Sequence, residues 1–148
     1  MALQAVDPQQ RYVDYALTWA NFHKWTPRNG VNTCDADDQC CGQTYVDLVP
    51  YTNKDYRDVL SVVIANLDHQ MVTPNDKKNA TAKTKGTQPS LYGWWTWIDA
   101  IQMAMPLYMQ IYKLTGDAKY RDHGLKMYLW SRNECGGGLF NTKDGLWW

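Results

Sequence analysis

Apolar side chains recur at helical spacing along almost the whole chain, and this regularity limits the fold more than any other feature. Residues 9–23 read QQRYVDYALTWANFH, with aromatic and aliphatic side chains two to four positions apart. This period is typical of an amphipathic helix rather than of a strand. Further helices are predicted over residues 35–49, 55–71, 97–114 and 117–130. We therefore expect an all-α protein.

Two segments lack the helical period. Residues 72–96 begin with a polar stretch rich in Lys, Asn and Thr, which predicts a long surface loop. Residues 135–148 contain three consecutive glycines and the pair Asp144-Gly145 between short apolar runs, which predicts a hairpin-like turn. With 148 residues, the chain fits a single domain.

The composition excludes several classes of partner. Fifteen basic and fifteen acidic residues cancel, so nothing favours a nucleic acid or an anionic membrane surface. No apolar run reaches the roughly 18 residues of a membrane span, and MALQAVDPQQ does not resemble a signal peptide, so we expect a cytoplasmic or periplasmic protein. Ten Tyr and eight Trp against two Phe favour an aromatic surface that also meets water or a ligand.

The cysteines do not have the spacing of a metal site. Cys40 and Cys41 are adjacent, Cys34 and Cys135 stand apart, and the three histidines are scattered. We expect free thiols rather than a zinc site, although a disulfide stays open. No metal or cofactor is predicted.

A short motif occurs twice. Tyr56-Arg57-Asp58 returns 64 residues later as Tyr120-Arg121-Asp122, each time after a predicted helix end and a short turn. A repeating helical hairpin would explain the recurrence, because each hairpin buries its apolar face only against its neighbours. Coincidence between two ordinary helix starts is the alternative.

Tryptophans crowd the segment GWWTWIDAIQ, and Asp99 follows them at a predicted helix start. Two interpretations of this acid are open. Thr96 and Asp99 have the spacing of a capping box, in which the acid only stabilises the first helical turn. Alternatively, burial against tryptophan rings raises the pKa of a carboxyl group, and Asp99 would then keep a proton and act as a general acid.

A second acidic helix start lies in CDADDQCCGQTYVDL, where Asp35, Asp37 and Asp38 occur together. Aspartates at this place cap a helix and complement its dipole. Three exceed what one cap requires, so one of them is a candidate second catalytic carboxylate. Gly42 follows one turn later, and glycine inside a helix costs about 1 kcal/mol relative to alanine. It predicts the close approach of another helix or of a ligand.

The segments ADDQCCGQTYVDL, WTWIDAIQMAMP and LTGDAKYRD together resemble the unsaturated glucuronyl and rhamnogalacturonyl hydrolases, glycoside hydrolase families 105 and 88. The resemblance implies an (α/α)6 barrel, in which six helical hairpins form a ring. It also implies a substrate that polysaccharide lyases produce, an oligosaccharide with a terminal 4,5-unsaturated uronic acid. The implied reaction is hydration of the C4=C5 double bond: a carboxylic acid protonates C4, water adds at C5, and the resulting hemiketal opens and releases the neighbouring sugar.

By position, the resemblance gives the acid/base role to Asp99 and the second active-site aspartate to Asp37. Asp38 is the alternative to Asp37 and a candidate for substrate binding. A wall that faces the sugar is expected from the tryptophans before Asp99, because aromatic faces suit a pyranose ring: Trp94, Trp95 and Trp97. Of the three, Trp97 is the one that we most expect to pack in the core instead.

The chain is short for a closed ring, because a repeat of that length requires roughly 350 to 400 residues. We therefore expect residues 1–148 to form one partial (α/α) barrel domain, with exposed helix faces that favour self-association or an accompanying segment. Two other functions stay open. One is a non-catalytic carbohydrate-binding or regulatory module derived from such an enzyme. The other, ranked lower, is an epimerase-like enzyme, whose histidine acid/base groups the scattered histidines do not match.

Overall fold

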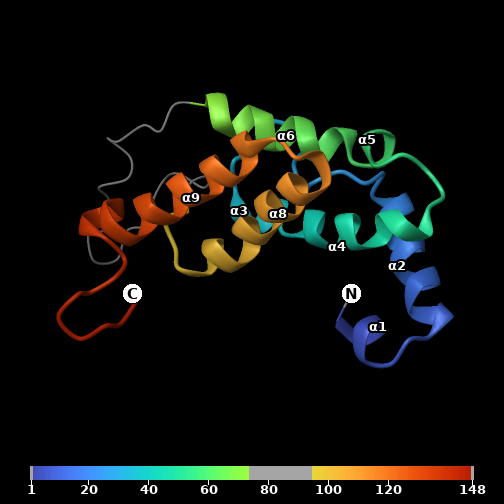
Figure 1. Ribbon diagram of the computed structural model, residues 1–148, viewed down its shortest axis with the longest axis horizontal. Coiled ribbons are helices and arrows are strands. Elements are labelled where there is room, and N and C mark those ends of the chain that lie inside the picture. Colours follow the sequence, from blue (N-terminus) through green and yellow to red (C-terminus); the bar gives the residue numbers. More distant parts are fainter. Residues whose placement is uncertain (1, 74–94, 148) are drawn as a thin grey trace.

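A computed structural model describes residues 2–73 and 95–147, and most of these residues are helical (Figure 1). The elements, in chain order, are α1 (Ala2–Val6), α2 (Gln10–Phe22), α3 (Ala36–Gln39), α4 (Cys41–Leu48), the 3-10 turn η1 (Val49–Tyr51), α5 (Tyr56–Val59), α6 (Ser61–Val72), α8 (Asp99–Thr115), α9 (Ala118–Asn133) and the 3-10 turn η2 (Cys135–Gly137). The predicted all-α fold is confirmed. Most of the segment 72–96, including Trp94, lies outside the described residues.

Helices α2, α8 and α9 lie where the periodicity predicts them. The other two predicted helices are each divided in two, by Cys40 between α3 and α4 and by Leu60 between α5 and α6. Leu60 leaves helical geometry, with φ −99° and ψ 12°, and its side chain is fully buried. Neither position carries the Gly or Pro that marks a helix break in a sequence. The apolar periodicity therefore predicted one continuous helix in each case.

Aspartates cap three of the helices. The side chains of Asp35, Asp55 and Asp117 accept hydrogen bonds from the backbone amides two positions later, at 3.0, 2.7 and 3.0 Å. Gly116, with φ 72°, ends α8 in the left-handed region that favours glycine. The predicted turn between α8 and α9 is confirmed.

Both Tyr-Arg-Asp segments lie at helix starts, in α5 and α9, but in different registers. Asp55 caps α5 directly before Tyr56, whereas Asp117 caps α9 three residues before Tyr120. The likeness between the two segments is therefore one of helix starts after a turn, not of residue-for-residue position.

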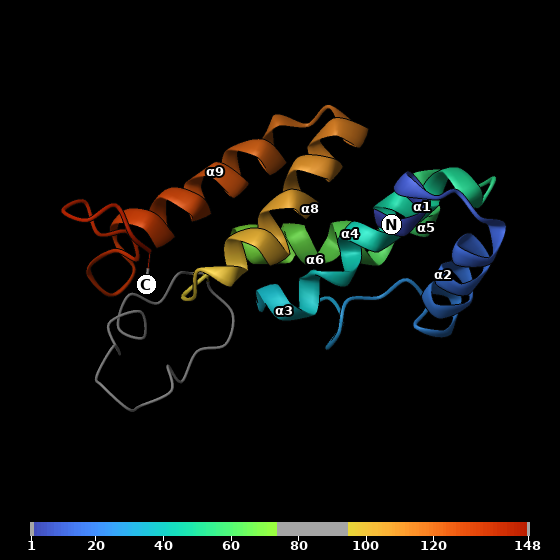
Figure 2. The ribbon, with the colours of Figure 1, turned by 90° about the horizontal axis from the view of Figure 1, so that it is seen from below.

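The helices pack as hairpins around one core. Helices α8 and α9 form a hairpin, α3 and α4 pack against α8, and α2 packs against α4 (Figures 1 and 2). The core holds fully buried aliphatic side chains from α4, α6 and α8, among others Leu48, Leu67, Leu107 and Ile111. Of the described helices, none is long and apolar enough to cross a membrane.

The chain turns back after α9. Phe140 and Trp147 form an antiparallel bridge, and the amide of Asn141 donates to the carbonyl of Leu146 at 2.8 Å. Gly145 supplies the positive φ of 73° that the turn requires. This hairpin-like turn brings Trp147 back beside α9.

Candidate active site

Asp99 is the first residue of α8, and its side chain is exposed. The predicted capping box is wrong: Ile98 is the N-cap residue and offers no side-chain hydrogen bond, so Thr96 does not fill this role. The amide of Ala100 bonds instead to the carbonyl of Trp97 at 3.3 Å. The helix dipole still favours a negative charge at this position.

Asp99 borders an open hollow of about 500 Å³. The side chains around it come from the start of α8, from α9 and from the C-terminal turn: Ile98, Asp99, Ile101, Gln102, Tyr128 and Trp147. The rings of Tyr128 and Trp147 lie 6.0 Å apart, and Phe140 supports Trp147 from 5.2 Å. An aromatic wall therefore stands beside Asp99, although not the one predicted from the neighbouring tryptophans.

The tryptophans before α8 have the opposite environments from those predicted. Trp95 is fully buried, packs edge-on against Tyr108 at 6.1 Å, and accepts a 2.6 Å hydrogen bond on its carbonyl from Ser131. It therefore presents no face to a sugar. Trp97, predicted to be the one in the core, is 61% exposed. The expectation that tryptophan rings bury Asp99 is wrong for the described residues, because the carboxyl group is exposed.

Asp38 holds the loop before α3 in place. Its carboxylate is buried and accepts hydrogen bonds from Asn29 at 2.9 Å and Thr33 at 2.6 Å, and the Arg28 guanidinium lies 3.7 Å from its other oxygen. A buried carboxylate with these partners stabilises the loop, because its removal would leave the Asn29 and Thr33 donors without their acceptor. Its burial and its partners do not favour the predicted role of Asp38 in substrate binding, which stays a prediction.

The other two acids of this start have different surroundings. Asp35 caps α3, and partial burial raises the pKa of its carboxyl group, as do the negative charges of Asp37 and Asp38. The hydrogen bond from the Asp37 amide and the Arg28 charge oppose this rise. Asp37 is exposed, and no described residue binds its carboxylate. It is the acid of this group that is left available to a ligand.

A buried amide network braces α3. Gln39 donates to the side-chain oxygens of Asn66 and Gln70, both at 2.9 Å, and the Tyr108 hydroxyl donates to the same oxygen of Gln70 at 2.7 Å. Asn66 also donates to the carbonyl of Thr33 at 2.7 Å. These buried hydrogen bonds favour one arrangement of the core, although the Oε1 oxygen of Gln39 has no hydrogen-bond partner among the described residues. The network ties the loop before α3 to both α6 and α8.

A glutamine side chain from α4 replaces a backbone hydrogen bond that α8 lacks. Pro106 has no N–H, so the carbonyl of Gln102, four residues earlier, loses its usual helical partner. The side chain of Gln43 donates to this carbonyl at 3.0 Å and to that of Met103 at 2.8 Å. The bond joins α4 to α8 one turn after Asp99, and so it fixes the position of Asp99 relative to the acids of α3.

Gly42 permits the close packing of these helices. A Cβ atom at this position would lie 2.6 Å from the Cδ2 atom of Leu107. Of the two predicted reasons for this glycine, the approach of another helix is confirmed.

The thiols do not form a reactive or metal-binding group. Cys34, Cys40 and Cys41 are free thiols, as expected, and burial raises the pKa of all three, which keeps them protonated near neutral pH. Over residues 2–73 and 95–147, no three His, Cys, Asp or Glu side chains gather as a cation site.

The chain matches Glycosyl Hydrolase Family 88 over residues 2–148. It belongs to this family. It is also similar to a solved structure of a polysaccharide lyase, with a TM-score of 0.68 and 22% sequence identity over 98% of this chain. The match covers 39% of that lyase chain, and at this identity the likeness shows the fold alone, an (α/α)-type arrangement of helices. Among curated proteins, the comparison finds no match.

In this family 88 chain, tertiary packing brings together groups that the sequence separates widely. Asp37 lies on α3, which packs against the helix that Asp99 begins (Figure 1). Sequence reasoning missed Tyr128, Trp147 and the Gln39 network. The polar residues Asn66 and Gln70 on the same face as Val63 and Leu67 were the available signal for the network, because polar groups on an apolar face need partners.

Proposed function

We propose that this chain carries the acid-bearing part of a hydrolase that acts on oligosaccharides ending in a 4,5-unsaturated uronic acid. Membership of family 88 over residues 2–148 is the observation that carries the proposal. The open hollow beside Asp99 supports it, because an exposed carboxyl group next to aromatic rings suits a pyranose ring that must be held and protonated.

In the proposed reaction, the sugar lies against Tyr128 and Trp147, and Asp99 donates a proton to C4. Water adds at C5 and gives up a proton that restores Asp99. The resulting hemiketal opens and releases the neighbouring sugar. Asp99 is exposed without substrate, so we propose that the bound sugar itself removes water from the carboxyl group, which favours its protonated form.

Asp37 has a supporting role in this proposal. A negative charge near an acid favours the protonated form of that acid. Asp37 has no partner within the described ranges that would neutralise it, and its helix packs against α8. We propose that its charge acts on the bound substrate from α3 without taking part in proton transfer.

The reaction can be followed by NMR in heavy water with unsaturated digalacturonate and with an unsaturated rhamnogalacturonan disaccharide. We expect the alkene proton signal to disappear, deuterium to appear at C4, and the neighbouring sugar to be released. An Asp14→Asn variant, altered at an exposed acid on α2, should react at the wild-type rate. Release of the sugar with the double bond intact would contradict hydration.

A binding module without turnover is the second candidate, and the exposure of Asp99 favours it. Calorimetry with the same disaccharides separates the two functions. Heat of binding with an unchanged alkene signal would support the module, whereas absence of binding would exclude it.

A further inference from the structure

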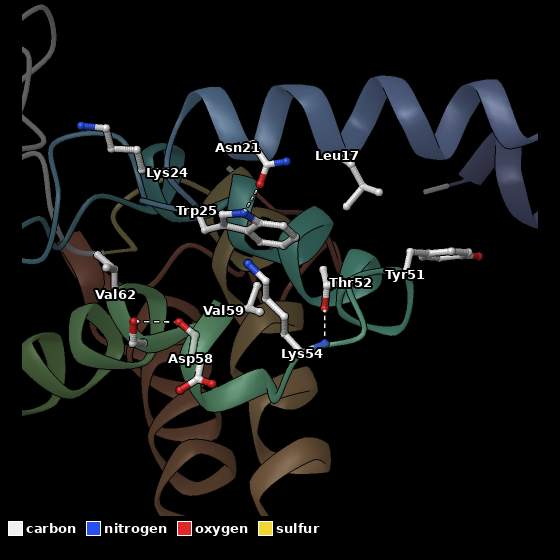
Figure 3. A pocket seen from close by; sticks show the side chains of 11 residues that line it. Leu17, Asn21, Lys24, Trp25, Tyr51, Thr52, Lys54, Asp58, Val59 and Val62 are labelled. Carbon is white, nitrogen blue, oxygen red and sulfur yellow. Dashed lines mark hydrogen bonds between the residues drawn. The ribbon is translucent and has the colours of Figure 1, made fainter.

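A second hollow, of about 360 Å³, lies among α2, the turn after η1 and the start of α6 (Figure 3). Its lining is mixed, with aromatic, cationic and amide side chains, among them Asn21, Lys24, Trp25, Tyr51, Thr52 and Lys54. In both ribbon views, α2 lies toward the end of the molecule opposite the start of α8 (Figures 1 and 2). The hollow is therefore separate from the one beside Asp99.

Trp25 is held in a strained but fixed position. Lys24 and Trp25 have φ values of 54° and 55°, in the left-handed region, which costs roughly 1–2 kcal/mol for a residue other than glycine. The Asn21 side chain accepts a 2.9 Å hydrogen bond from the indole N–H, and Tyr45 supports the ring from 5.5 Å. Strained backbone conformations that the surrounding contacts hold in place occur most often at binding and active sites.

A cationic side chain lines the same hollow as this indole. Figure 3 shows the Lys54 side chain extending toward Trp25, whereas the Lys24 ammonium and the Asp58 carboxylate point away from the ring. Lys54 is exposed and, within residues 2–73 and 95–147, forms no ion pair. An unpaired ammonium beside a fixed aromatic face is arranged to receive a flat ligand that carries a negative charge.

We propose that this hollow binds an acidic sugar residue, a uronate within a polysaccharide. The apolar face of the pyranose ring lies on the Trp25 indole, and the uronate carboxylate pairs with the Lys54 ammonium. The amide N–H₂ of Asn21, whose oxygen is already used by Trp25, donates to a sugar hydroxyl. The site needs no double bond in its ligand, so it holds saturated residues of a chain away from the hollow beside Asp99.

Calorimetry with saturated trigalacturonate, and with neutral maltotriose as the matched ligand, tests this site. We expect Lys54→Ala to weaken trigalacturonate binding at least about tenfold, the loss of one hydrogen bond to a charged group. Lys113→Ala, altered at an exposed lysine on α8, should bind as the wild type does.

Two results would overturn the proposal: equal affinity of the wild type and Lys54→Ala for trigalacturonate, or equal affinity of the wild type for maltotriose and trigalacturonate. Because the ligand is saturated, neither result depends on whether the chain hydrates an unsaturated uronide. A failure at this site is thus distinguishable from a failure of the proposed reaction.

Discussion

The two acidic helix starts share a sequence signal and differ in what surrounds the acids. At α3, Asp38 is 4% exposed and has three partners. The hydrogen bonds of Gln39 also join this helix to α6. At α8, Asp99 is exposed at the edge of an open hollow. A buried carboxylate whose oxygens already accept hydrogen bonds stabilises a loop, whereas an exposed one at the edge of a hollow is available for chemistry. Three changes test this contrast.

The largest effect is expected at Asp38. Asp38→Ala leaves the Asn29 and Thr33 donors without their acceptor, and we expect the free energy of unfolding to fall by roughly 2–4 kcal/mol. Asp37→Ala, one residue away and exposed, should change it by less than about 0.5 kcal/mol. Urea unfolding of both variants measures the difference. Equal losses would show that the two acids are not distinguished by structure.

The link between the two regions should have an intermediate effect. We expect Gln43→Ala to cost roughly 1–2 kcal/mol, because the carbonyl of Gln102 loses its partner. In a Pro106→Ala background the restored amide bonds to that carbonyl, so the same change should cost at least about 0.5 kcal/mol less. A double-mutant cycle by urea unfolding measures this coupling. Strictly additive losses would contradict the role given to Gln43.

The smallest effect concerns the pH dependence of the free energy of unfolding, through a histidine that packs against the Gln39 network. The His123 ring lies 5.2 Å from Tyr108, and burial lowers the pKa of His123 to about 4, with the Lys126 charge acting in the same direction. Because the unfolded chain binds this proton near pH 6.5, the contribution of neutral His123 is full above that pH and is lost as the pH falls toward 4. We expect a loss of up to about 1 kcal/mol, discounted for the partial exposure of the ring.

Unfolding free energies measured from pH 7 to pH 5 for the wild type and His123→Phe check this expectation. The variant should lose less stability than the wild type over that range. His23→Ala, altered at an exposed histidine, should follow the wild type. Parallel curves for His123→Phe and the wild type would show that His123 does not carry the pH dependence.

The periodic helices were predictable because one apolar stripe fixes both the existence and the buried face of a helix. The environments of the tryptophans were not predictable, because the predicted helix begins at residue 97 whereas α8 begins at Asp99. Trp95 and Trp97 therefore both precede the helix, and its period does not determine their burial. Likewise, the acids of α3 looked equivalent in sequence, and only the partners of Asp38 separate it from Asp37. The glycine pattern of the tail predicted its turn, but not that Trp147 would reach the hollow beside Asp99.

The most direct test of the account is the initial rate of double-bond loss in wild type and Asp99→Asn, followed by ultraviolet absorbance with unsaturated digalacturonate. If the open carboxyl group of α8 is the proton donor, the rate falls at least about 100-fold while the urea midpoint is unchanged. A variant that keeps the wild-type rate with the same midpoint would contradict the assignment of Asp99.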